Sequence, residues 1–68
     1  MIINTIVMIK GNLIATSGWD GKVMLWSSKT NQLEQEIQLD HYVNHMNYHN
    51  ESLYVGGKDG SLTKINIT

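Results

Sequence analysis

Residues 17–26 of this 68-residue chain have the sequence SGWDGKVMLW, and residues 56–65 have the related sequence GGKDGSLTKI. The second stretch lies 39 positions after the first, and both contain an Asp-Gly pair, at Asp20-Gly21 and at Asp59-Gly60. An Asp-Gly pair between two apolar runs favours a tight hairpin turn, because glycine tolerates a positive φ. The repeated pair therefore predicts two similar hairpins.

The similarity continues upstream at an offset of 40 residues, over the pairs Ile3 and Val43, Ile6 and Met46, Met8 and Tyr48, and Leu13 and Leu53. The change of offset predicts that one residue is gained or lost between Leu13 and Asp20. A period of about 40 residues built of short strands is typical of the blades of a β-propeller. We therefore expect an all-β chain made of antiparallel four-stranded blades, a partial propeller of about two blades.

Seven short segments between polar or glycine-containing breaks are predicted to be strands. Residues 32–39 also fit a helix, because glutamate and glutamine are good helix formers. The alternation of Leu33, Gln35, Ile37 and Leu39 favours a strand instead. The first blade is expected at residues 1–40, and the second, without its last strand, at residues 41–68. The expected strands are residues 3–9, 12–17, 22–26, 32–39, 43–48, 53–56 and 61–67.

The segment 22–26 is apolar on both sides, with Val23 and Leu25 on one face and Met24 and Trp26 on the other. Such a strand must be covered on both faces, as it is when sheets stack around an axis. Two repeats cannot bury their faces alone. Expected partners therefore include further propeller blades, either from a longer parent chain or from other copies of this chain.

Composition excludes several classes of function. The chain has no cysteine, so it contains neither a disulfide nor a CxxC-type zinc site. Its net charge of −1 argues against a nucleic-acid surface or a polybasic membrane patch. The apolar run at residues 2–9 is far shorter than the roughly 20 residues of a membrane span. Neither nucleic acid nor a membrane is expected as a partner.

The sequence DGKVMLW at residues 20–26 resembles the end of a WD40 repeat, in which a turn aspartate precedes a strand that ends in Trp-Asp. Ser27 replaces the final aspartate of that motif. His41 stands where the family carries the histidine of its Gly-His pair, with Asp40 in place of the glycine. The resemblance covers nearly the whole chain. It implies an intracellular protein, cytoplasmic or nuclear, that binds other proteins as a scaffold and is not an enzyme.

The resemblance also implies structural roles for four residues, Asp20, Trp26, His41 and Asp59. Many WD40 blades hold a hydrogen-bonded tetrad of His, a strand Ser or Thr, the turn Asp and the Trp. In the first repeat Asp20 and Trp26 are accompanied by Ser17 or Thr16, and the histidine of this repeat would lie at or before Met1. A buried indole N–H needs an acceptor, so Trp26 must find a partner other than histidine.

The second repeat has the complementary half of the tetrad. His41 and Asp59 are present, Ile65 replaces the tryptophan, and glycines stand at the Ser or Thr position. We expect His41 and Asp59 to remain as a pair across the second blade.

A second resemblance leaves an alternative open. LYVGGKDG at residues 53–60 is similar to the repeats of quinoprotein-like propellers, whose usual Thr-Gly would correspond to Thr30-Asn31. It implies a fragment of an enzyme or of a membrane-assembly factor. Trp26 and His41 favour the WD40 resemblance. Trp19-Asp20-Gly21 followed by residues 57–60 also resembles the C-terminus of G-protein-β-like scaffold proteins.

No catalytic, cofactor-binding or metal-ligating residue is predicted. His41, His45 and His49 are spaced as zinc ligands on a helix, but in a strand they would lie far apart. Asp20 and Asp59 occupy repeated positions, which indicates a role in the fold and not in acid–base chemistry. Trp19 lies beside a turn, and large amphipathic aromatic residues favour interfaces. We expect Trp19 to contact a partner.

Overall fold

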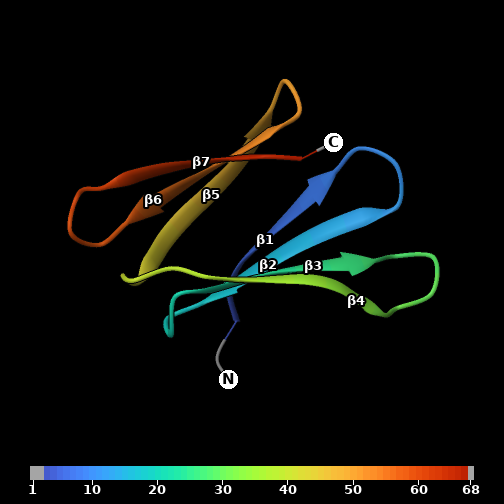
Figure 1. The fold of residues 1–68 in the computed structure, drawn as a ribbon, viewed down its shortest axis with the longest axis horizontal. Coiled ribbons are helices and arrows are strands. Elements are labelled where there is room, and N and C mark those ends of the chain that lie inside the picture. Colours follow the sequence, from blue (N-terminus) through green and yellow to red (C-terminus); the bar gives the residue numbers. More distant parts are fainter. Residues whose placement is uncertain (1–2, 68) are drawn as a thin grey trace.

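The computed structural model describes residues 3–67, which contain seven strands and no helix (Figure 1). The all-β prediction is confirmed, including a strand where residues 32–39 also fitted a helix. Each predicted strand is present, with its ends within one residue of the expected ones. The ends of the two predicted blades at Met1 and Thr68 lie outside the described residues. The strands are β1 (Ile3–Ile9), β2 (Leu13–Gly18), β3 (Lys22–Ser27), β4 (Leu33–Gln38), β5 (Val43–His49), β6 (Ser52–Gly57) and β7 (Leu62–Asn66).

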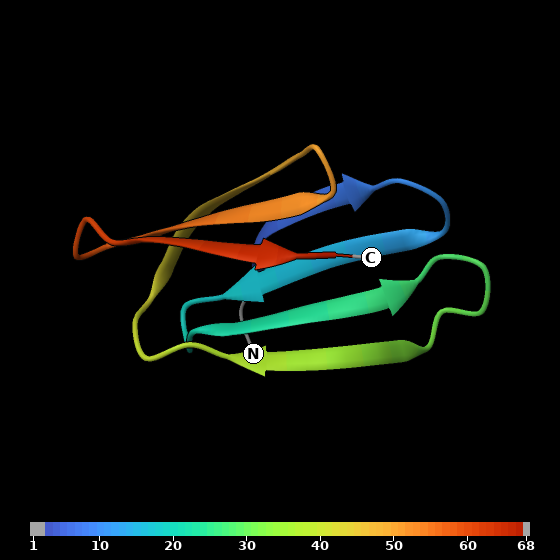
Figure 2. The ribbon, with the colours of Figure 1, turned by 45° about the horizontal axis from the view of Figure 1, so that its top comes forward.

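The strands form two antiparallel sheets. The first has four strands in the order β1-β2-β3-β4, and the second has three in the order β5-β6-β7. The sheets stack on each other with β1 and β5 making the closest contact between them, and β4 and β7 lie apart (Figures 1 and 2). A single hydrophobic core lies between the sheets and draws side chains from both.

The two Asp-Gly hairpins have the same geometry. Gly21 donates its N–H to the carbonyl of Gly18 (3.2 Å), and Gly60 donates its N–H to the carbonyl of Gly57 (3.1 Å). The two donor glycines have φ of +83° and +88°, which is a region that other residues enter only at a cost. The repeat seen in the sequence is therefore also a repeat of backbone conformation.

The extra residue of the first repeat lies in the turn between β1 and β2, so its predicted place between Leu13 and Asp20 is wrong. Ile9 pairs with Leu13 across three turn residues. In the second sheet His49 pairs with Ser52 across only two.

The shorter turn explains why the sequence comparison misplaced the extra residue. Both of its residues have positive φ, Asn50 at 49° and Glu51 at 63°, as in a two-residue hairpin turn of type I′. Asn-Glu is not the usual sequence for that turn, so no local signal marked it. As a consequence Ile14, and not Leu13, occupies the position equivalent to Leu53.

The first sheet presents a different face on each side, because side chains alternate along a strand. The side toward the second sheet, here called the aliphatic face, is rich in small apolar side chains. Its rows across the strands are Thr5–Ser17–Val23–Ile37 and Val7–Ala15–Leu25–Gln35. The other side, here called the open face, has the rows Ile6–Thr16–Met24 and Met8–Ile14–Trp26.

The second sheet has two faces that correspond to these position by position. Its covered face lies on the aliphatic face of the first sheet and has the rows Met46–Val55–Thr63 and Tyr48–Leu53–Ile65. Its polar face points away and has the rows His45–Gly56–Leu62 and Asn47–Tyr54–Lys64. The covered face is the repeat equivalent of the open face, and the polar face is the equivalent of the aliphatic face. The two sheets therefore stack in the same orientation, the back of one on the front of the other.

Leu53→Ala is expected to lower the free energy of unfolding by about 2–5 kcal/mol, because the fully buried side chain fills the layer between the sheets. Leu62→Ala is the matched control in the same sheet, since Leu62 lies on the polar face and is 72% exposed. It should change the free energy of unfolding by about 0.5 kcal/mol or less. Urea unfolding of the two variants measures both values, and equal losses would contradict this assignment of the faces.

Gly21→Ala and Gly60→Ala form a second matched pair. Both residues have positive φ, which costs a non-glycine residue about 1–2 kcal/mol. A Cβ at Gly21 would also lie 2.7 Å from the carbonyl oxygen of His41 and 2.9 Å from that of Leu39, whereas a Cβ at Gly60 meets open space. Thermal unfolding should therefore show a larger loss of stability for Gly21→Ala. The reverse order would show that the first turn does not pack against residues 39–41.

Candidate functional site

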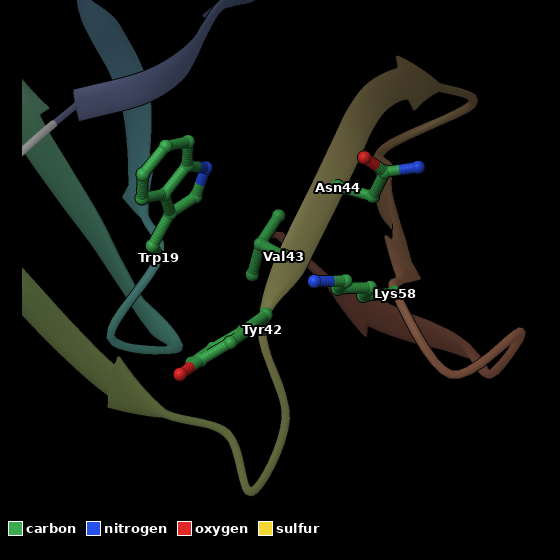
Figure 3. Close-up of a pocket in the computed structure, with 5 residues that line it drawn as sticks. All are labelled: Trp19, Tyr42, Val43, Asn44 and Lys58. Atoms are coloured by element: carbon green, nitrogen blue, oxygen red, sulfur yellow. The ribbon is translucent and has the colours of Figure 1, made fainter.

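A cleft of about 280 Å³ opens at the end of the stack that carries the Asp-Gly turns. Three segments meet there: the β2–β3 turn, the linker of residues 39–42 between the sheets, and the β6–β7 turn (Figure 1, left side). The side chains that line the cleft are Trp19, Tyr42, Val43, Asn44 and Lys58 (Figure 3).

Two aromatic side chains form the walls of this cleft. Trp19 comes from the β2–β3 turn and is 57% exposed, and Tyr42 comes from the linker and is 55% exposed. Between them lies Val43, which is buried at the start of β5 (Figure 3). Trp19 and Tyr42 therefore present large amphipathic surfaces to solvent above an apolar floor, an arrangement that suits an interface anchor.

Lys58 joins the linker to the turn of the second sheet in two ways. Its ammonium group lies over the ring of Tyr42, with Nζ 5.8 Å from the ring centroid, within the range of a cation–π interaction. Its backbone N–H donates to the carbonyl of Tyr42 (3.2 Å). Lys58 is also the repeat equivalent of Trp19, since the two residues lie 39 positions apart. Trp19 and Lys58, which occupy equivalent positions of the two repeats, therefore both line the cleft.

The turn that carries Trp19 is tied to the linker that carries Tyr42. Leu39 donates its N–H to the carbonyl of Gly21 (2.9 Å). The Gln38 side chain donates from Nε2 to the carbonyls of Asp20 (3.0 Å) and Leu39 (2.9 Å). Because both walls of the cleft belong to one hydrogen-bonded unit, the backbone beneath the aromatic rings is held in place.

A hydrogen bond between the sheets fixes the floor of the cleft. Asn4 donates from Nδ2 to the carbonyl of Val43 (2.7 Å). Both residues lie at β-bulges that occur at the same place in the two repeats, one at residues 3–5 and one at residues 43–45. Bulges redirect side chains at the ends of strands, and here the two bulges lie where Asn4 of β1 meets Val43 of β5 at the cleft.

The predicted structural aspartates hold the turns. The Asp20 carboxylate accepts the backbone N–H of Lys22 (3.1 Å), and the Asp59 carboxylate accepts that of Ser61 (3.0 Å). In both turns the aspartate binds the backbone two residues further on, which is a common way for aspartate to stabilise a turn. The repeat thus extends to the side-chain hydrogen bonds of the two hairpins.

His41 and Asp59 lie close to one another but do not form a hydrogen bond. The Nδ1 atom of His41 lies 3.0 Å from the carbonyl oxygen of Tyr42. Both side chains approach Gly57, where a Cβ would be 2.6 Å from Nδ1 of His41 and 2.9 Å from Oδ1 of Asp59. The nearby Ser61 hydroxyl and the Ser61 backbone N–H lower the pKa of Asp59, and the charge of His41 lowers it further. Only the backbone N–H is within hydrogen-bonding geometry of the carboxylate, since the hydroxyl oxygen has no hydrogen-bond partner.

Trp26 has a hydrogen-bond partner on its own sheet. Its Nε1–H donates to Oγ1 of Thr16 (2.9 Å), and both side chains lie on the open face. The sequence left Thr16 and Ser17 as alternatives. Ser17 is buried on the aliphatic face, so the alternation of side chains along β2 leaves Thr16 as the residue that can reach the indole.

The described residues form neither a metal site nor a membrane-spanning helix. Among residues 3–67, no three His, Cys, Asp or Glu side chains are grouped so as to hold a metal ion. The described part of the chain also contains no helix long and apolar enough to cross a membrane. His45 and His49 are both exposed on β5.

Comparisons with protein-family models, with curated proteins and with solved structures each return no match.

Sequence reasoning singled out Trp19 but not the cleft around it. The contributions of Tyr42, Asn44 and Lys58 depend on how the two sheets stack, which no local pattern encodes. One signal was present in the sequence: the 39-residue offset aligns Trp19 with Lys58, which assigns the two residues to equivalent positions of the two repeats.

Ser61→Ala is expected to raise the pKa of Asp59 toward its ordinary value, because the Ser61 hydroxyl is the largest cause that lowers it. A lowered pKa in the folded state contributes stability above the unfolded value of about 3.9. That stability is lost as the pH falls through the folded pKa. Ser61→Ala should therefore make unfolding less dependent on pH in this acidic range.

An NMR titration of the Asp59 carboxyl carbon measures the effect directly. Ser28→Ala, a change at an exposed serine in the β3–β4 loop, serves as the control and should leave the pKa of Asp59 unchanged. An unchanged Asp59 titration in Ser61→Ala would contradict the role given to the hydroxyl.

Proposed function

We propose that this chain is a two-blade segment of a WD40-like β-propeller that acts as a protein-interaction scaffold, and that a partner protein binds at the cleft of Trp19, Tyr42 and Lys58. The observation that carries the proposal is this convergence of two half-exposed aromatic rings and one ammonium group. They come from three separate segments of the chain and meet on a hydrogen-bonded backbone.

The stacking of the sheets supports the propeller part of the proposal. In a propeller, antiparallel sheets repeat around an axis, so each sheet lies in the same orientation on its neighbour. The two sheets of this chain stack in that way, with their innermost strands β1 and β5 in contact. Their Asp-Gly turns and bulges also recur at equivalent positions. The first sheet has four strands, and the second would be completed by one further strand on β7.

The Trp26–Thr16 hydrogen bond supports the WD40-like assignment over the quinoprotein-like one. It joins a strand threonine to the tryptophan that ends β3, which is the contact that the WD40 resemblance implies. The quinoprotein-like resemblance gives Trp26 no role. The scaffold assignment carries with it the intracellular location expected for such proteins.

The proposed mechanism is geometric and involves no chemical step. Large aromatic residues bind partners well because they bury much surface with few rotatable bonds. A backbone that is already ordered loses little entropy on binding. The hydrogen bonds from Gln38 and Leu39 hold the backbone of the β2–β3 turn in place. The backbone N–H of Lys58 holds the linker in place through its hydrogen bond to Tyr42. Propeller loops of this kind bind through the rim of the stack.

Site-specific photo-crosslinking in cells tests the interaction. A photoreactive phenylalanine at position 19 is expected to capture a partner protein. The same group at position 34, an exposed site on β4 that lines neither the cleft nor the hollow on the first sheet, is not. Adding Tyr42→Ala to the position 19 variant should remove the captured protein while the urea unfolding midpoint stays near that of the parent. Equal capture at positions 19 and 34, or capture that is indifferent to Tyr42→Ala, would contradict the proposal.

A further inference from the structure

The open face of the first sheet is apolar, and within residues 3–67 the second sheet does not pack on it. Thr16 and Met24 are buried on this face, whereas the β1 side of it is open to solvent. Ile6, in the middle of β1, is 63% exposed, and Met8, near the end of β1, is 69% exposed. A hollow of about 300 Å³ crosses this face and is lined mainly by Ile6, Ile14, Thr16 and Trp26. Exposed apolar patches with a polar rim commonly mark interaction surfaces; here Ser27, Ser28 and Asn31 supply that rim.

We infer that the open face is the docking surface for a separate antiparallel β-sheet that presents a face of small aliphatic side chains, and that a second copy of this chain is not its occupant. This inference rests on the proposed function and deepens it by naming the chemistry of one partner surface.

The chain itself contains the template for this contact. The covered face of the second sheet is the repeat equivalent of the open face, so Met46 corresponds to Ile6 and Leu53 to Ile14. In the structure Met46 and Leu53 are buried to 2% and 0% exposure by the first sheet. The side chains that bury them belong to the aliphatic face, with Ala15 and Val23 at its centre. The same kind of face therefore fits the open face.

The second sheet does not offer such a surface to another copy. Its polar face would be the one to meet the open face in a ring of identical chains. There Asn47, Tyr54 and Lys64 stand where the aliphatic face has Val7, Ala15 and Leu25. Burying the ammonium and amide groups without partners costs free energy. Tyrosine in place of alanine would also overfill the contact. The occupant must come from outside these 68 residues.

A tandem fusion tests the inference with Trp26 as the reporter. Residues 1–42 are placed ahead of residue 3 of the chain, so that the linker of residues 39–42 joins the added sheet as it joins the native ones. Phenylalanine replaces every tryptophan except the Trp26 that belongs to the full chain. The added aliphatic face should cover the open face, blue-shift the emission of that Trp26 and reduce its quenching by acrylamide severalfold. Unchanged quenching in a folded fusion would overturn the inference.

The matched control gives the added copy the residues of the polar face. Val7→Asn, Ala15→Tyr and Leu25→Lys in that copy alone reproduce Asn47, Tyr54 and Lys64. This fusion should leave Trp26 as accessible as it is in the 68-residue chain with Trp19→Phe. Equal protection by both fusions would overturn the requirement for an aliphatic face.

Two substitutions in the 68-residue chain keep the inference testable if a fusion does not fold. Ile6→Lys changes the open face and should leave the unfolding midpoint and the sedimentation coefficient unchanged. Met46→Lys, at the equivalent position of the covered face, should unfold the chain. If Ile6→Lys is equally disruptive, or if the parent chain self-associates and shields Trp26, a second copy occupies the open face and the inference is wrong.

The readouts also separate this inference from the proposed function. Trp26 lies on the sheet face and Trp19 at the cleft, so protection of Trp26 can fail while crosslinking at position 19 succeeds. The reverse result would leave the docking surface intact and remove the proposed partner site at the cleft.

Discussion

Burial of apolar side chains between the two sheets is the interaction on which every other feature of this chain depends. A chain of 68 residues without cysteine has no disulfide to stabilise it and a small core. The side chains with no exposed surface at all are concentrated in this layer, among them Ala15, Val23, Leu53 and Val55. The cleft depends on the same layer, because Trp19 and Lys58 belong to different sheets and meet only when the sheets are stacked.

The two outer faces of the stack differ, because the second sheet exposes a polar face and the first sheet exposes an apolar one. This asymmetry links the fold to the proposed function. The second sheet shows the solvent a face with His45, Asn47 and Lys64, whereas the first sheet shows it Ile6 and Met8. When sheets stack in one orientation, the two outermost faces of the stack are always of different kinds. Of the two outer faces, the open face of the first sheet is the one with the composition of a surface that becomes buried. A partner sheet there and a partner at the cleft would engage different parts of the chain.

Local patterns were sufficient to predict the strands and the Asp-Gly turns. Period-2 alternation decided the strand at residues 32–39, and the glycines at positions 21 and 60 have the positive φ that the turns require. The position of the extra residue was predicted wrongly, because Asn50-Glu51 forms its two-residue turn without the usual glycine. Once the open face was known, the alternation of side chains along β2 identified Thr16 as the hydrogen-bond partner of Trp26. The cleft was beyond prediction, since it arises from the relative placement of the two sheets.

Solvent paramagnetic relaxation of the methionine methyl groups tests the stacking most directly. Met46 and Met8 lie on repeat-equivalent faces, yet one is 2% exposed and the other 69%. In the isolated chain a soluble gadolinium chelate should strongly relax the Met8 methyl and leave the Met46 methyl almost unaffected. NOEs should also join Met46 to the aliphatic face of the first sheet. Equal relaxation of the two methyl groups would contradict the stacking of the sheets and the functions proposed from it.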